Sequence, residues 1–451
     1  MGVPTRVFVP APRWITPASF GRATMAPAMT ADRFGNEHAP GLPYARGAIV
    51  TSMQADLRKL ARAHRIIERI VRDRGQQGVF NFTGLERSFQ LDAADLVFAD
   101  DEIAPALYGD RLLAAGLQHL GGTAATHEVA LFNRLTAATV ATHLTLVKPG
   151  EVVVGVSPSY SHPTVVRAAA AAGARFVETT GVRQFADALA REPRVALVAL
   201  TRLAVTYDIL SADDLKTIVT LARDKGVVIY VDDAGGARVG PAVFGQPRTL
   251  DLGVDVGATG LDKYGTVGPR LGLLAGDKSL VGRIRARAIE LGLEARPMLY
   301  PAAVRSLEQY DPARVRALVE STRTVAHALR RLLGARLHET PVTAQLRGED
   351  TLELALEQTG STTTSVVPVE ATAALAMLLL EDHGIVTVHF AGLPPGTSSL
   401  LFKFMPPETV TRFGGPDAFA RAVAASLGKL GSYVADPERL RELLLGRDDA
   451  A

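Results

Sequence analysis

Residues 227–272 read VVIYVDDAGGARVGPAVFGQPRTLDLGVDVGATGLDKYGTVGPRLG and carry the strongest signal in the chain. The apolar, β-branched run from Val227 to Val231 predicts a buried strand that ends at two carboxylates, Asp232 and Asp233. A second short strand pattern ends just before Lys263, which lies in a glycine-rich turn. Open α/β sheets bind ligands outside the carboxyl ends of their strands, so this stretch predicts a ligand site with an aspartate and a lysine.

An aspartate and a lysine in this arrangement are what a pyridoxal phosphate (PLP) site needs. The lysine forms a Schiff base with the cofactor, and the aspartate keeps the pyridine nitrogen protonated so that the ring can accept electrons. We therefore expect Lys263 to bind PLP and to act as the base at the substrate Cα, and Asp232 to hold the ring nitrogen. Asp233 points to the other face of the strand, because side chains alternate along it, and we expect a structural role for it.

The domain organisation follows from composition and periodicity. Residues 1–47 are rich in proline, alanine, arginine and glycine without periodicity, which predicts a flexible tail. Residues 48–300 should form a large PLP-binding domain, because strand and helix patterns alternate there and predict a mostly parallel sheet with helices on both faces. Its first amphipathic helix is expected to pack on a small α+β domain at residues 301–451.

Shorter segments are assigned from their local patterns. Residues 124–135 are expected to form a helix that follows the glycine pair at 121–122. In the small domain, strands are expected at 352–358 (LELALEQ), 387–391 (TVHFA) and 400–405 (LLFKFM).

Composition limits the classes of function. The chain has 451 residues, 47% of them hydrophobic, which is enough for a large domain and a smaller one. Its formal charge of +2 gives no bulk electrostatic case for nucleic acid or a membrane as partner. The absence of cysteine excludes disulfides and thiolate metal sites, and we expect no metal. No apolar run reaches about eighteen residues and no secretory signal is evident, so we expect a cytoplasmic protein.

The string TGLDKYGTVGPRLGLLAGDKSLVGRIR, residues 259–285, resembles the lysine segment of selenocysteine synthase, the bacterial seryl-tRNA selenium transferase. The resemblance extends loosely from about residue 80 to about residue 310. Its members are fold-type I PLP enzymes, so it implies an aspartate aminotransferase-like α/β fold with PLP as cofactor. It also implies a homodimer or a larger homo-oligomer, because active sites of this fold lie at subunit interfaces.

The resemblance also implies residues that hold the cofactor. The phosphate position corresponds to the start of a helix at Thr136 and Ala137, where a hydroxyl and backbone N–H groups suit an anion. Thr259, four residues before the lysine, is where a hydroxyl commonly reaches the phosphate. The loop SPSYSHP, residues 157–163, offers Tyr160 or His162 to stack on the pyridine ring. A stacked His162 could also serve as an acid or base near Cα.

Substrate-binding residues are expected in two places. Arg270 lies in a Gly-Pro-Arg loop and could bind a carboxylate or phosphate in a bidentate manner, or form a structural ion pair. The C-terminal segment bears a weaker resemblance to tryptophanase and tyrosine phenol-lyase. That alignment puts Phe402 where those enzymes have the arginine for the substrate carboxylate, with Lys403 beside it. Lys403, Arg412 and Arg270 are the alternatives that could replace this arginine.

These observations favour a PLP-dependent lyase that acts at Cα of an amino acid or amino-acid-like metabolite by elimination or C–C cleavage. An aminotransferase is the first alternative. An oxidative decarboxylase or oxygenase of secondary metabolism is the second, because the usual arginine clamp is not evident. A non-catalytic PLP-binding protein is the third. No G-x-G-x-x-G follows a first strand, which disfavours a dinucleotide enzyme.

Overall fold

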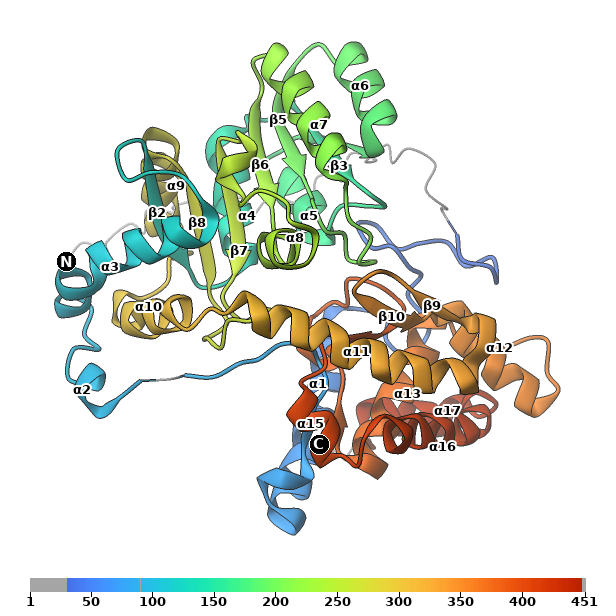
Figure 1. Ribbon diagram of the computed structural model, residues 1–451. Helices are drawn as coiled ribbons and strands as arrows, with labels where there is room; N and C mark the ends of the chain where they lie inside the picture. Colours follow the sequence, from blue (N-terminus) through green and yellow to red (C-terminus); the bar gives the residue numbers. More distant parts are fainter. Residues whose placement is uncertain (1–30, 90, 448–451) are drawn as a thin grey trace, which may run out of the picture.

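The computed structural model describes residues 31–89 and 91–447 and shows two parts, with the large sheet in one and a helix-rich small domain in the other (Figure 1). The sheet of the large domain has the strand order β2-β8-β7-β6-β5-β3-β4. β8 runs antiparallel to both of its neighbours, and the other neighbouring pairs are parallel. The strands are β2 (His127–Phe132), β3 (Val152–Ser157), β4 (Arg175–Thr180), β5 (Val195–Leu200), β6 (Val228–Asp232), β7 (Val256–Gly260) and β8 (Gly272–Asp277).

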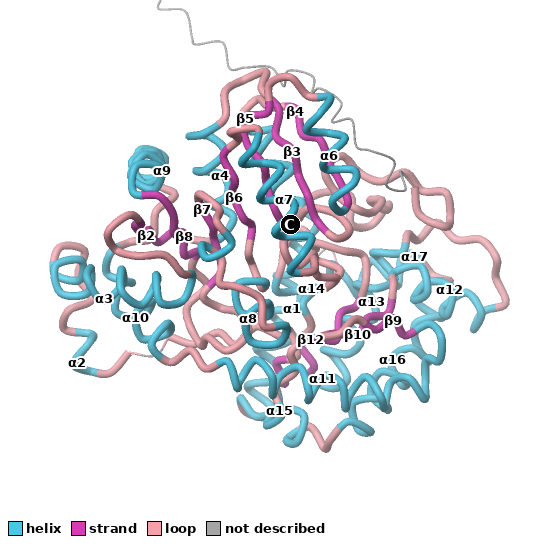
Figure 2. The backbone as a smooth tube through the Cα atoms, turned by 45° about the horizontal axis from the view of Figure 1, so that its top comes forward, coloured by secondary structure: helices cyan, strands magenta, loops and turns pink. Residues whose placement is uncertain are grey.

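Helices cover both faces of this sheet (Figure 2). Successive strand residues alternate between the faces, so Val153 and Val154 belong to two different apolar cores. One face packs against α4 (Leu135–Leu146), α5 (Pro163–Ala171) and α9 (Lys278–Leu291). The other packs against α3 (Ile103–Leu120), α6 (Gly181–Arg191), α7 (Ala212–Asp224) and α10 (Tyr300–Glu308). Burial of both faces explains why the strands are nearly continuous apolar runs.

The small domain takes residues from both ends of the described chain. Its antiparallel sheet has the order β12-β10-β9, and α1 packs against α13 and α17. The two-stranded pair of β1 and β11 is parallel. The strands are β1 (Phe80–Asn81), β9 (Leu337–Glu339), β10 (Thr343–Leu346), β11 (Ile385–Val386) and β12 (Leu400–Lys403). The helices are α1 (Met53–Arg74), α11 (Pro312–Leu333), α12 (Gly348–Thr359), α13 (Pro368–His383), α14 (Val388–Ala391), α15 (Pro407–Arg412), α16 (Pro416–Val434) and α17 (Pro437–Leu445).

Three of the local assignments are wrong. Residues 124–135 were expected as a helix, but β2 occupies most of this range, because its backbone pairs in register with β8 at the edge of the sheet. Residues 352–358 were expected as a strand but lie within α12, where Leu352, Ala355 and Leu356 are buried at helical spacing. Residues 387–391 fall largely in the short helix α14 instead of a strand.

The tail expected at residues 1–47 is described only from residue 31 onward. In that part Leu42 and Tyr44 are buried, and the Tyr44 hydroxyl donates a hydrogen bond of 2.9 Å to the Pro395 carbonyl. Arg33 pairs with Asp350 of the small domain at 2.6 Å. Residues 31–47 are therefore packed on the body of the protein. Within the described ranges, no helix has both the length and the apolar character that a membrane crossing needs.

Candidate functional site

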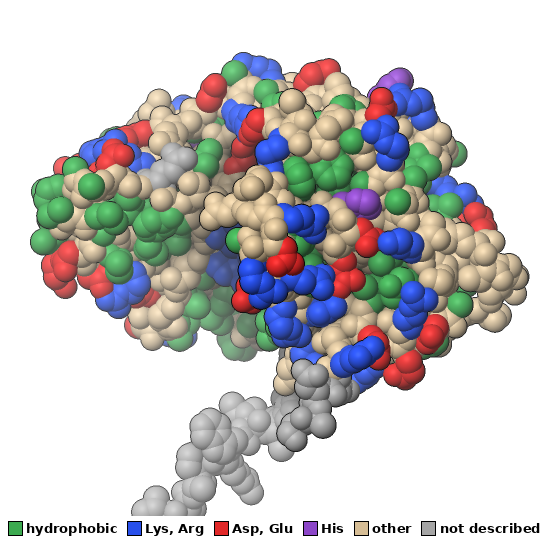
Figure 3. Space-filling model, turned by 90° about the horizontal axis from the view of Figure 1, so that it is seen from below, with side chains coloured by type: hydrophobic (Ala, Val, Ile, Leu, Met, Phe, Trp, Pro, Cys, Tyr) green, Lys and Arg blue, Asp and Glu red, His purple; other side chains and the backbone are tan. Residues whose placement is uncertain are grey.

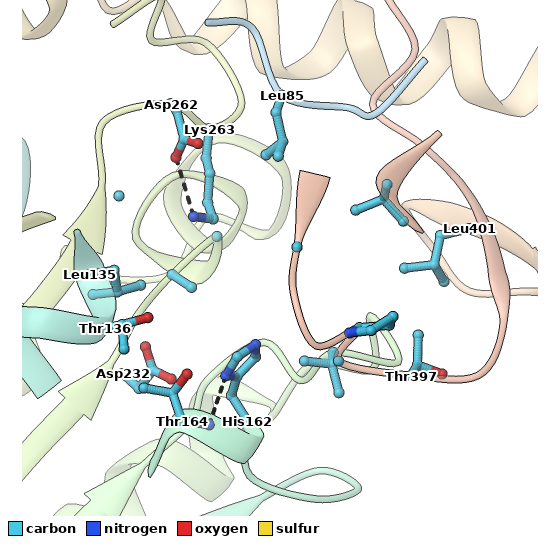
Figure 4. A pocket seen from close by; sticks show the side chains of 18 of the residues that line it. Leu85, Leu135, Thr136, His162, Thr164, Asp232, Asp262, Lys263, Thr397 and Leu401 are labelled. Carbon is cyan, nitrogen blue, oxygen red and sulfur yellow. Dashed lines mark hydrogen bonds and ion pairs between the residues drawn. The ribbon is translucent and has the colours of Figure 1, made fainter. Parts of the chain in front are cut away.

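A pocket opens where β5, β6 and β7 end at their carboxyl edges (Figure 4). Thr201, Asp232 and Gly260 line it from these strand ends, and residues 388–403 of the small domain line its other side. It encloses about 270 Å³, which is at the small end of the range for small-molecule sites. Figure 4 shows Lys263 and Asp232 on opposite sides of the cavity, with both side chains directed into it.

Asp232, at the end of β6, is a buried carboxylate with an unused oxygen. Its Oδ1 has no hydrogen-bond partner among the described residues. Burial raises the pKa of Asp232 to about 7, although the charge of Lys263 acts in the opposite direction. A buried carboxylate without a partner is costly, so the geometry suits a ligand that brings a positive N–H group to this oxygen.

Asp233 faces away from the pocket, as expected from the alternation along the strand. It is fully buried and forms an ion pair with the equally buried Arg202, whose Nε lies 3.1 Å from Asp233 Oδ1. Thr249 donates a further hydrogen bond of 2.7 Å to the same carboxylate. Adjacent aspartates therefore have opposite surroundings: Asp233 is fully paired, and Asp232 has an oxygen available.

Lys263 follows β7 and its amine lies beside a second carboxylate that the sequence analysis missed. Its Nζ lies 3.3 Å from Asp262 Oδ1. Arg87 donates to the other oxygen of Asp262 at 3.0 Å, and Arg270 lies 3.9 Å from it. Burial alone would raise the pKa of Asp262, but the charges of Lys263 and Arg87 hold it below its usual range. Gly260 leaves room for the lysine, because a Cβ there would lie 2.7 Å from Lys263 Nζ.

The amino-terminal end of α4 faces the same cavity. Thr136 and Arg134 line the pocket there, and Thr136 is exposed. A helix N-terminus with a hydroxyl and a guanidinium group suits a phosphate. The backbone N–H of Ala137, which was expected to bind the phosphate, already donates to the Arg134 carbonyl at 2.9 Å. The Ala137 side chain is buried.

Of the two ring-stacking candidates, His162 lines the pocket. Its Nδ1 accepts a hydrogen bond of 3.1 Å from the Thr164 N–H at the start of α5, which fixes the ring. Burial lowers the pKa of His162 to about 3, and the charges of nearby cations act in the same direction, so the ring is neutral. Tyr160 lies outside the lining, and its hydroxyl donates to the Gly396 carbonyl at 3.4 Å.

Lys403 enters the pocket from β12. Its Nζ donates to the hydroxyl of Tyr207 at 2.6 Å and to that of Tyr264 at 3.2 Å. The two phenols lie 2.8 Å apart. Burial lowers the pKa of Lys403 to about 7, and the charge of Lys263 acts in the same direction. The neighbouring Phe402 is buried in the core of the small domain, so Lys403 is the cation that this strand presents.

The structure therefore brings together most of the residues expected from the sequence. Thr259 is an exception, because its buried hydroxyl accepts from Arg238 at 3.1 Å and donates to the Ala234 carbonyl at 3.2 Å. Asp262 and Tyr264 flank the lysine in the sequence, and this adjacency was the one available signal for them. The expected residues that line the pocket are Lys263, Asp232, Thr136, His162, Arg270 and Lys403, and those outside it are Ala137, Tyr160 and Thr259. The lining residues that were missed include Arg87, Arg134, Asp262, Tyr207 and Tyr264.

Comparison with known proteins gives a consistent group of relatives. A protein of Methanothermobacter thermautotrophicus named "UPF0425 pyridoxal phosphate-dependent protein" is 32% identical over 396 residues, which cover 87% of this chain and 98% of that protein. A protein of the same name from Methanosphaera stadtmanae is 29% identical over 351 residues, covering 77% of this chain and 88% of that protein. No protein-family model matches the chain.

Solved structures similar to this one include serine palmitoyltransferase of Sphingomonas wittichii, with a TM-score of 0.54 and 18% identity over 77% of this chain and 87% of that chain. Alanine–glyoxylate aminotransferase of a Nostoc species matches with a TM-score of 0.51 and 16% identity, over 78% and 95% of the two chains. Identities this low establish the fold alone. The expected α/β fold of PLP-dependent transferases, with a mostly parallel central sheet, is confirmed.

Proposed function

The chain belongs to the family of UPF0425 pyridoxal phosphate-dependent proteins, and from this premise we propose that it is a PLP enzyme that acts at Cα of an amino-acid-like metabolite. The observation that carries the proposal is the unpaired, buried oxygen of Asp232 across the cavity from Lys263. A protonated pyridine nitrogen would give this carboxylate its missing partner, and Lys263 would bind the aldehyde carbon at the opposite end of the ring.

The remaining residues of the pocket fit the other parts of the cofactor. Thr136 and Arg134 at the start of α4 would hold the phosphate. His162 would lie against the ring, since its neutral, fixed imidazole is a flat surface that adds no charge. PLP, when bound, supplies an electron-withdrawing ring that stabilises negative charge at the substrate Cα.

Positive charge on the substrate side favours an acidic substrate. Arg270 is exposed at the rim of the pocket, 3.9 Å from Asp262, and Lys403 lies in the pocket without an ion-pair partner among the described residues. We propose that these two side chains bind the anionic group of the substrate, in place of the arginine clamp that the C-terminal segment lacks. Burial lowers the pKa of Arg270 to about 10, so it remains charged at neutral pH.

We propose lyase chemistry as the reaction, by elimination or C–C cleavage. Transamination needs one group that moves a proton between Cα and the cofactor, and Lys263 suffices for it. Elimination needs a base at Cα and also an acid at the leaving group. The pocket contains ionisable groups beyond Lys263, namely Lys403 with its two phenols, which supports the lyase over the aminotransferase. The resemblances to selenocysteine synthase and to tryptophanase stay predictions, as does a cytoplasmic location.

A homodimer or larger homo-oligomer is also part of the proposal. Seen from below, the molecule gathers apolar side chains on the side that carries α2 (Ala93–Leu96) and α3 (Figure 3). Leu96, Val97 and Ile103 are exposed there, and contiguous exposed apolar surface of this kind marks interfaces. Sedimentation velocity of the wild type and of Val97→Asp tests this: a lower mass for the variant is expected, and a monomeric wild type would contradict it.

The test of PLP binding uses borohydride reduction followed by peptide mass spectrometry. Reduction fixes the cofactor covalently on the lysine that holds it, and we expect the added mass on the peptide with Lys263. Lys263→Ala should lose both this mass and the visible absorption band, whereas Lys278→Ala, an exposed lysine at the start of α9, should keep both. Absence of the added mass from wild-type Lys263 would refute the proposal.

The reaction class is tested with amino acids in D2O. Deuterium at Cα together with release of an oxo acid, without any added amino acceptor, is expected for a lyase. Stoichiometric transfer of the amino group to an added oxo acid would identify an aminotransferase instead and refute the lyase assignment.

A further inference from the structure

Tyr207, Tyr264 and Lys403 form a closed triangle of hydrogen bonds at the wall of the pocket. The three distances are 2.6 Å, 3.2 Å and 2.8 Å, and all three residues are buried while lining the cavity. They come from the loop after β5, the loop after β7 and the end of β12. Lys403 forms no ion pair with any described residue, so no carboxylate among them neutralises its ammonium group.

Three residues in and beside this triangle have strained backbone conformations. Tyr207, Tyr264 and Phe404 are the non-glycine residues with positive φ in the described chain, at 66°, 36° and 45°. Phe404 stacks on the Tyr264 ring with centroids 3.6 Å apart. Non-glycine residues in this backbone region are strained and gather at functional sites. Three such residues in mutual contact point to a function for the triangle.

Two glycines leave the space that the triangle occupies. A Cβ at Gly235 would lie 2.5 Å from Cε2 of the Tyr264 ring. A Cβ at Gly84, whose φ is +69°, would lie 2.5 Å from the Lys403 carbonyl oxygen and 2.9 Å from its Cγ. At both glycines the backbone therefore lies directly against a residue of the triangle, where a side chain would collide with it.

We propose that Tyr207, Tyr264 and Lys403 act together as the acid that protonates the leaving group of the substrate, while Lys263 removes the Cα proton. This inference rests on the lyase function proposed above. The electron pair of the Cα–H bond forms the Cα=Cβ double bond, and the Cβ–X bond breaks with its pair on X. A phenol gives X its proton, so that H–X leaves. Solvent or the protonated Lys263 then returns a proton to the phenolate, and no oxidant or reductant is needed.

The ionisation of the three groups agrees with this role. Burial raises the pKa of Tyr207 and of Tyr264, so both phenols carry their protons at neutral pH and can donate them. A phenolate left after donation would lie within 3.2 Å of the Lys403 ammonium group, which stabilises the negative charge and can return a proton. The triangle thus supplies a second acid–base group that Lys263 alone does not provide.

The functional test compares two probe amino acids with different leaving groups. Chloride leaves β-chloro-L-alanine without a proton, whereas the hydroxyl of L-serine needs one. For Tyr207→Phe/Tyr264→Phe we expect deuterium exchange at Cα and pyruvate from β-chloro-L-alanine to stay within about threefold of the wild type. Pyruvate from L-serine should fall about 100-fold or more. Tyr310→Phe, which alters a tyrosine that packs on His119 outside the pocket, should leave all three rates unchanged.

Equal losses with both probes, or no loss with either, would overturn the inference. Absence of Cα exchange in the wild type with both probes would instead count against the proposed function, and a measurement without substrate then decides the inference. It uses NMR titration of the ¹³C-labelled Lys403 amine, whose pKa is lowered to about 7 by burial. Tyr207→Phe/Tyr264→Phe should lower the pKa of this amine further, because the ammonium group loses both hydrogen-bond acceptors, and Tyr310→Phe should leave it unchanged. A Lys403 amine that titrates identically in the double variant and in the wild type would overturn the coupling on which the inference depends.

Discussion

Replacing Asp232 with asparagine should stabilise the protein without PLP, and the gain should depend on pH. Burial holds the pKa of Asp232 at about 7 in the folded state, against an ordinary value of 3.8. The unfolded chain therefore gives up this proton more readily than the folded one, and ionisation destabilises the folded state increasingly as the pH rises from about 4 to about 7. The resulting penalty is roughly 2 kcal/mol at pH 5.5 and roughly 4 kcal/mol at pH 8.

Urea unfolding of the apoprotein at pH 5.5 and pH 8 measures this effect. Asp232→Asn should be more stable than the wild type at both values, with about 2 kcal/mol more gain at pH 8. Asp233→Asn is the matched control, since it leaves the buried Arg202 without its partner and should lose about 3–5 kcal/mol. Equal destabilisation by both substitutions, or a gain that does not change with pH, would refute the reasoning.

The same substitution should reduce the stability that PLP adds to the protein. Asparagine carries no negative charge to hold a protonated ring nitrogen, so the increase in melting temperature that PLP gives should be smaller in Asp232→Asn than in the wild type. If Asp232→Asn stabilises the apoprotein and also reduces the stabilisation by PLP, then Asp232 serves cofactor binding and lowers the stability of the unliganded fold.

The remaining predictions concern the pocket and its supports. Thr136→Val should weaken PLP binding about tenfold by fluorescence titration, whereas Thr259→Val should leave it unchanged because that hydroxyl bonds within the protein. Gly235→Ala should lower the unfolding free energy by about 1–3 kcal/mol in urea, since its Cβ would overlap the Tyr264 ring, and an unchanged midpoint would contradict this. Ser211→Ala should cost about 1 kcal/mol in the same assay, because Ser211 Oγ accepts the Asp214 N–H at the start of α7.

The parts of the site that the sequence predicts are those carried by a single strand end. Asp232 follows a β-branched run and Lys263 follows a short strand pattern, so the doubly wound topology alone brings both to one edge of the sheet. Thr136, in the first turn of α4, and His162, just before α5, line the same pocket, and the resemblance to fold-type I PLP enzymes implied both. Local pattern and topology agree at these positions, so the residues expected there lie together at the pocket.

Contacts between distant segments could not be predicted in this way. The bond between Lys403 and Tyr207 joins residues 196 positions apart, and it depends on how the small domain packs on the large one. The errors in secondary structure have the same cause. The segment HEVALF is a strand because β8 lies beside it, and LELALEQ is a helix because its leucines face the small-domain core.

The small-domain core also has a consequence for synthesis on the ribosome. Ile66 and Ile70 of α1 pack in the same core as Leu440 and Leu444 of α17, although nearly the whole large domain separates them in the sequence. The first helix must therefore leave the exit tunnel long before its partners are translated. Until then its apolar side stays exposed to solvent or bound to a chaperone. The large sheet can form meanwhile, so residues 388–403 complete the pocket only after its other lining residues have been translated.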